Sequence, residues 1–218
     1  MNAVVEGACS AKALSEATTA GTVCGSCKPL LENLAGDAGA REKEPNHLSI
    51  LFFGLLALGV AAGIFFIPGI STSDTVQDFA PLETLWNDKF WKQFTGFSIL
   101  GMSAVALLMS IRKRVKNDIF GEYRHWRMAH IILGCACVTA LVAHTGLHLG
   151  ANLNRLLILD FLAVIAVGAF AAVSLSVSHR LSANTALKLK KFWTWGHIFL
   201  VWPLPILLAI HIFTVYYY

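Results

Sequence analysis

Charged residues are scarce in this chain of 218 residues. Aspartate, glutamate, lysine and arginine make up only 14% of it, with 13 acids and 17 bases, while hydrophobic residues make up 56%. A soluble domain of this length can bury a core with fewer apolar residues and needs more charge on its surface. The shortage of charge therefore excludes an ordinary soluble domain and predicts an integral membrane protein.

Five apolar runs are long enough to cross a bilayer, and none of them looks like a cleaved signal peptide. A spanning helix needs about 20 residues, and backbone groups in hydrocarbon must find their hydrogen bonds within the segment. We therefore predict an all-α membrane protein, a five-helix transmembrane bundle with a small N-terminal helical segment of iron–sulfur type. The runs are Leu48–Pro68, Thr95–Ile111, Met128–Leu149, Leu156–Val177 and Phe192–Val215.

The connections between the runs differ in charge. Residues 112–127 and 178–191 are rich in lysine and arginine, whereas residues 69–94 contain four acids and two lysines. By the positive-inside rule, the two basic connections face the cytoplasm. We expect a multi-pass protein of the bacterial inner (plasma) membrane with a cytoplasmic N-terminus.

Four histidines repeat one spacing in two of the runs. His130 and His144 lie 14 residues apart in the third run, and His197 and His211 lie 14 apart in the fifth. This spacing puts both side chains within about 40° on one helical face and about 21 Å apart along the axis. The two helices run in the same direction, so His130 is level with His197, and the other two are level with each other. Each level pair can hold one iron from opposite sides, which predicts two haem b groups.

A different reading of these histidines stays open. A single intramembrane histidine often only bonds to a neighbouring helix, and a small transporter or assembly factor could use such residues for metal or proton handling. Ionisable residues in spans are costly and usually functional. The same spacing on two parallel helices is hard to obtain by accident, which favours haem.

The remaining histidines have weaker patterns. His148 follows His144 by four residues, so we expect it on the same helical face, beside a haem propionate or a quinone site. We expect His47, His125 and His179 in solvent or headgroup surroundings, because they flank the apolar runs.

Glycine and proline mark two of the spans. Gly134 and Gly146 could let a porphyrin approach the third helix, although small residues also serve ordinary helix packing. Pro203 and Pro205 lie between the two histidines of the fifth run, and we expect them to kink that helix.

The third and fifth runs, with H-x13-H in each, resemble the ferric reductase-like transmembrane domain family, which includes NADPH oxidases and related cytochromes b. The resemblance covers about residues 48–218. It implies that electrons cross the membrane through two haems, one held by His130 and His197, the other by His144 and His211. No flavin or nicotinamide domain follows the runs, so a role as an oxidoreductase component stays open.

The segment before the first run contains a second motif, Cys24-x-x-Cys27, within AGTVCGSC. It resembles the bacterioferritin-associated ferredoxin-like [2Fe-2S] domain, in which two further cysteines, spaced C-x-C, lie upstream. Their absence here suggests a truncated start or the remnant of a longer fusion, and a cluster takes four ligands. A lone CxxC can also be a redox pair or half a zinc site.

Cys135 and Cys137 point to different sides of the third helix, so we expect them to pack as small hydrophobes.

These patterns divide the chain into a partial [2Fe-2S]-binding segment with its linker (1–46) and a haem-binding transmembrane domain (47–218). We expect electrons to pass from a cytoplasmic reductase or other donor through the iron–sulfur segment and the two haems to a quinone or periplasmic acceptor. The lipid bilayer is the expected surrounding, and no nucleic acid is expected as a partner.

Overall fold

The computed structural model describes residues 10–21, 31, 34–35, 46–69, 86, 88–114 and 123–217. Within these residues every regular element is a helix, so the predicted all-α class is confirmed. Helix α2 (Ala11–Thr18) begins after Ser10, whose hydroxyl accepts a hydrogen bond from the backbone N–H of Ala13 at 3.1 Å. The predicted iron–sulfur residues Cys24 and Cys27 lie outside the described residues.

Five helical segments of the described chain are long and apolar enough to cross a membrane, which confirms the five-span prediction. The chain is therefore a multi-pass membrane protein. The spans are α4 (His47–Phe66), α6 (Lys89–Arg114), α7 (Tyr123–Thr145), α8 (Asn152–Ser176) and a fifth made of α9 (Ala183–Val201) and α10 (Leu204–Tyr217). A short 3-10 turn, η2 (Ser178–Arg180), joins α8 to α9.

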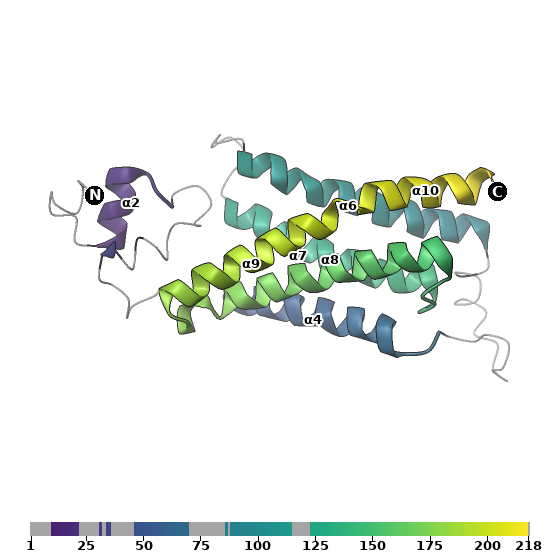
Figure 1. The fold of residues 1–218 in the computed structure, drawn as a ribbon, viewed down its shortest axis with the longest axis horizontal. Coiled ribbons are helices and arrows are strands. Elements are labelled where there is room, and N and C mark those ends of the chain that lie inside the picture. Colours follow the sequence, from purple (N-terminus) through teal and green to yellow (C-terminus); the bar gives the residue numbers. More distant parts are fainter. Residues whose placement is uncertain are drawn as a thin grey trace.

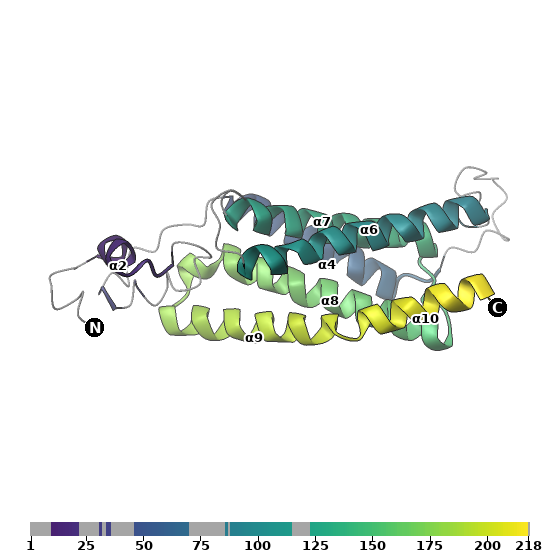
Figure 2. The same cartoon turned by 90° about the horizontal axis from the view of Figure 1, so that it is seen from above.

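Helix α8 is the centre of the bundle. It packs against α4, α7, α9 and α10, while α6 packs against α7 (Figures 1 and 2). Successive spans run in alternating directions (Figure 1). In the described residues no comparable backbone packing joins α7 to α9. The fifth span therefore packs directly against α8, and any contact between the fifth span and α7 is made by side chains.

Small residues bring the helices of the core together. A Cβ atom placed on Gly54 of α4 would lie 3.2 Å from Cγ2 of Val173 on α8, so the two backbones approach closely there. Ile64 is fully buried in this core. Cys135 and Cys137 are also buried, as predicted from their apolar setting.

Large apolar side chains cover much of the outer surface. Phe199 and Trp202 of the fifth span, for example, are 76% and 75% exposed. Water would make such a surface costly, whereas lipid tails are a favourable environment for it. The exposed aromatic residues therefore agree with a bundle surrounded by lipid.

The fifth span is broken at Trp202 and Pro203, between its two histidines. Proline has no N–H group and its ring clashes with the preceding turn, so it ends or kinks a helix. Around the break the N–H of Trp202 donates to the carbonyl of Phe199 at 3.3 Å, and the carbonyl of Pro203 accepts from Leu207 at 3.0 Å. The predicted kink is confirmed.

The third span ends earlier than its apolar run. Helix α7 stops at Thr145, because Gly146 and Leu147 adopt positive φ angles of 60° and 65°. The N–H of Gly146 still donates to the carbonyl of Val142 at 2.9 Å, which closes the last turn. A glycine in this conformation is a common helix stop. The prediction that the helix continues to Leu149 was therefore wrong.

Candidate functional site

The structure brings the four spaced histidines together as two pairs. The rings of His130 on α7 and His197 on α9 have centroids 6.1 Å apart and planes at 87°. The rings of His144 on α7 and His211 on α10 have centroids 6.5 Å apart and planes at 81°. We call these the first and the second histidine pair. The pairing predicted from the spacing is present in the fold.

Both pairs depend on how the two spans are built. Helix α7 is continuous, so it carries His130 and His144 on one side at two depths. The fifth span is broken, so His197 belongs to α9 and His211 to α10. Each half of the fifth span can therefore direct its own histidine toward α7.

Backbone carbonyls hold both rings of the first pair. The Nδ1 atom of His130 lies 3.1 Å from the carbonyl oxygen of Ala106 on α6. The Nδ1 atom of His197 lies 3.1 Å from the carbonyl oxygen of Val164 on α8. A carbonyl can only accept a hydrogen bond, so each Nδ1 carries the proton and donates. The Nε2 atom of each ring is then the unprotonated nitrogen that can bind a metal.

Side chains hold both rings of the second pair. The Nδ1 atom of His144 lies 3.0 Å from Oγ1 of Thr95, a buried residue of α6. That hydroxyl is directed at the carbonyl of Trp91 at 2.9 Å, which takes its only proton, so it accepts from the histidine. The Nδ1 atom of His211 lies 2.9 Å from Oδ1 of Asn154 at the start of α8. These bonds also leave Nε2 for a metal.

Two glycines make room for the rings. A Cβ atom on Gly96 of α6 would lie 3.1 Å from Cε1 of His144, and one on Gly168 of α8 would lie 3.1 Å from Cε1 of His197. A side chain at either position would press on the ring beside it.

The sequence predicts that Gly134 and Gly146 lie on the third helix, where a porphyrin could approach. A Cβ on Gly134 would meet Ile165 at 3.9 Å, and Gly146 lies beyond the end of α7, against the ring of Trp86. The prediction that Gly146 lies on the third helix was wrong, because α7 ends before it. At Gly134 a Cβ atom would face a neighbouring helix.

The ring separations can be tested against a haem iron. With a metal–nitrogen bond of about 2.0 Å and a ring nitrogen about 1.1 Å from its centroid, two imidazoles on opposite sides of one metal have centroids about 6.2 Å apart. The observed separations of 6.1 and 6.5 Å fall on either side of this value. The ring separations are therefore compatible with one metal between the two rings of each pair, and two imidazoles are the donor set of a bis-histidine haem.

The described residues contain no group of three or more His, Cys, Asp or Glu side chains arranged for a metal ion. A haem iron takes four of its six bonds from the porphyrin and needs only two side chains from the protein. Each pair offers that number, with the rings held in position by hydrogen bonds at Nδ1.

His148 does not lie where the sequence predicted. Because α7 ends at Thr145, His148 lies in the connection to α8 and does not share a helical face with His144. Its ring lies against Gly69 after α4, so close that no Cβ atom would fit at that glycine. The prediction that His148 and His144 share a helical face was therefore wrong.

The other three histidines lie near the end of the bundle that holds the first pair. His125 is exposed, as expected. His47 and His179 are partly buried and their ring centroids lie 5.9 Å apart. The Nδ1 atom of His179 also lies 3.1 Å from the carbonyl of Ser176. These two side chains therefore contact each other at the junction of α4 and η2.

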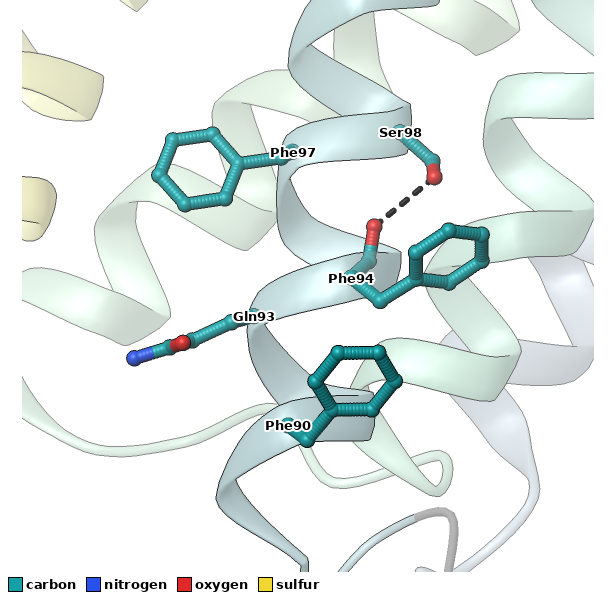
Figure 3. A pocket seen from close by; sticks show the side chains of 5 residues that line it. All are labelled: Phe90, Gln93, Phe94, Phe97 and Ser98. Atoms are coloured by element: carbon teal, nitrogen blue, oxygen red, sulfur yellow. Dashed lines mark hydrogen bonds between the residues drawn. The ribbon is translucent and has the colours of Figure 1, made fainter.

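A hollow of about 410 Å³ lies on another face of α6 (Figure 3). Its lining consists of Phe90, Gln93, Phe94, Phe97 and Ser98. Thr95 and Gly96, which face His144, do not belong to it. The hollow is therefore separate from the histidine pairs.

No protein-family model, curated protein or solved structure matches this chain. The site must therefore be judged from its own geometry.

Proposed function

We propose that this protein carries electrons across a membrane as a di-haem b-type cytochrome. The observation that carries the proposal is the double histidine pair, with two ring separations suited to one iron each and Nδ1 of all four rings engaged. A bound haem would supply reversible one-electron chemistry. The protein's part is to hold each ring in one tautomer and one orientation.

The arrangement suits transfer along the bundle axis. The 14-residue spacing on α7 sets the two pairs about 21 Å apart in depth. Two carriers about 21 Å apart in depth would cover most of a hydrocarbon core about 30 Å thick.

The partners belong to the same proposal. The resemblance to ferric reductase-like transmembrane domains supports an electron path through both haems, and the AGTVCGSC segment supports a cytoplasmic iron–sulfur donor. The basic connections support a bacterial inner membrane protein with a cytoplasmic N-terminus. We propose a cytoplasmic reductase as the donor and a quinone or a periplasmic protein as the acceptor.

The test is the haem content of the purified full-length chain. Pyridine haemochrome analysis should give two b-type haems per chain, with a spectrum typical of low-spin iron. His197→Ala should remove one haem and His211→Ala the other, whereas His125→Ala, on the exposed side of α7, should keep both. A colourless protein, or equal haem in the wild type and the two pair variants, would refute the proposal and favour a non-redox role.

A further inference from the structure

Asp160 is the only carboxylic acid within the five candidate spans. Ionisable residues at this depth are rare and costly, and they usually serve ion, proton or electron pathways. The side chain is partly buried, and its Oδ2 atom is enclosed with no hydrogen-bond partner among the described residues. Neither histidine pair uses this residue in the structure.

The depth of Asp160 lies between the two histidine pairs. Helix α8 holds His211 through Asn154 and His197 through the carbonyl of Val164. Asp160 follows Asn154 by six residues and precedes Val164 by four. At a rise of 1.5 Å per residue, these offsets correspond to about 9 and 6 Å along the axis. An acid at this depth lies between the two pairs, so a charge at either pair would act on it through the apolar interior.

Asp160 also lies on the side of α8 that meets the fifth span. Asp160, Val164 and Val167 share one helical stripe, and Val167 faces Gly196 of α9, where a Cβ atom would lie 3.6 Å from it. The two helices are antiparallel. Seven residues back from Val167 along α8 therefore corresponds to seven residues forward from Gly196, which is Pro203. Asp160 thus lies opposite the break in the fifth span.

The break favours a proton donor on the facing helix. Pro205 has no N–H, so it cannot supply the bond that the carbonyl of Val201 would receive in a regular helix. A protonated carboxyl group can donate to such an acceptor, whereas a carboxylate cannot. Burying a carboxylate in an apolar region is costly unless the group is paired, whereas a carboxylic acid can donate to an acceptor of this kind.

A positive charge at the histidine pairs would instead favour the carboxylate form of Asp160. A haem held by these rings would carry one more positive charge when oxidised than when reduced, and that charge would favour the carboxylate. Among the other titratable groups on these helices, the thiols of Cys135 and Cys137 lie in the middle of α7, and Tyr123, Tyr216 and Tyr217 lie at helix ends. The charged groups and the other histidines on the helices and turn packed around α8, and on α8 itself, lie toward the ends of the bundle. They are His47 on α4, Arg124, His125 and Arg127 on α7, Arg155 on α8, His179 and Arg180 on η2, and Lys188, Lys190 and Lys191 on α9.

We propose that Asp160 is a proton-binding site coupled to the redox state of the histidine-bound haems, an inference that rests on the proposed function. When one electron from the donor reduces a haem, Asp160 takes one proton from water and its carboxylate becomes a carboxylic acid. When the haem is oxidised again, the O–H bond breaks and the proton returns to water. Asp160 itself is neither oxidised nor reduced.

The test is the pH dependence of the haem midpoint potentials, followed optically in the purified full-length chain after its haem content is measured. Coupling to one proton lowers the potential by up to about 59 mV for each unit of rising pH. The wild type should show such a slope for at least one haem. Asp160→Asn should lose it, while Asp160→Glu should keep it. Asp88→Asn, which changes an acid before α6, should behave as the wild type.

A second measurement covers the case in which Asp160→Asn fails to bind haem. In the wild type, reduction should produce an infrared band of a protonated carboxyl group that shifts when aspartate is isotopically labelled. A haem-loaded protein with no slope and no such band, or an equal slope in Asp160→Asn, would overturn the inference and leave the proposed function intact. A chain without haem would instead refute the proposed function.

Discussion

Thr95 offers the sharpest single test of how the second histidine pair is held. Its hydroxyl accepts the Nδ1–H bond of His144 at 3.0 Å, and the residue is buried. Thr95→Val keeps the shape of the side chain and replaces the hydroxyl by a methyl group. The ring then loses its side-chain acceptor, and only the backbone carbonyl of Lys92 remains beside its N–H group.

The expected effect can be bounded from general energetics. Removing the hydrogen-bond partner of a metal-binding histidine typically lowers metal affinity about 10- to 100-fold. This corresponds to about 1.4 to 2.8 kcal/mol of binding free energy. The first pair should not change, because its rings are held by the carbonyls of Ala106 and Val164 on other turns and helices.

The assay needs one haem site at a time. In a His197→Ala background only the second pair can bind haem, and titration of the haem-free protein with haemin gives its affinity. Adding Thr95→Val should weaken binding by the stated factor. Thr139→Val is a matched control, because Thr139 is an exposed threonine of α7 whose hydroxyl bonds only to the carbonyl of Cys135 in its own helix. Equal affinities with and without Thr95→Val would refute the role given to this hydroxyl.

Three further predictions concern other parts of the chain. Gly168→Ala should disturb the first pair, at a cost of about 1–3 kcal/mol for overpacking, and lower its haem occupancy. Gly59→Ala is the control, because a Cβ atom at Gly59 meets open space, and it should leave both haems in place. Equal occupancy in both variants would contradict the close approach at Gly168. Cysteines introduced at Asp78 and Lys116 should react with membrane-impermeant reagents from opposite sides of the membrane, and labelling from one side would contradict the proposed orientation. The chain expressed alone should show a weak or absent [2Fe-2S] signal in electron paramagnetic resonance while it keeps its haems. A stoichiometric signal that survives Cys24→Ser would contradict the assignment of Cys24 as a cluster ligand.

The parts of this fold that the sequence predicts are those that depend on local properties. Apolar length decides how many segments can span, and helical periodicity decides which side chains share a face. The pairing of His130 with His197 follows from these two facts and from the alternating direction of the spans. The break at Pro203 is equally local, because proline cannot continue the hydrogen bonds of a helix.

The parts that the sequence did not predict depend on contacts between distant segments. Thr95 lies 49 residues before His144, and Asn154 lies 57 before His211, so neither spacing carries a signal. The carbonyl of Val164 has no side-chain signature at all. In the case of His148 a signal existed: Gly146 stands where a glycine commonly ends a helix, and it placed the histidine in a connection.

The two pairs are held by different kinds of hydrogen-bond acceptor, and this difference decides which pair a single substitution can alter. The first pair is held by backbone carbonyls, which persist whatever side chains Ala106 and Val164 carry. The second is held by a hydroxyl and an amide, which a single substitution can remove. Hydrogen bonds to ligating histidines adjust the electron density at the metal. Substitutions at Thr95 or Asn154 should therefore shift the potential of one haem alone, and so change the driving force for transfer between the two haems without moving either pair along the bundle.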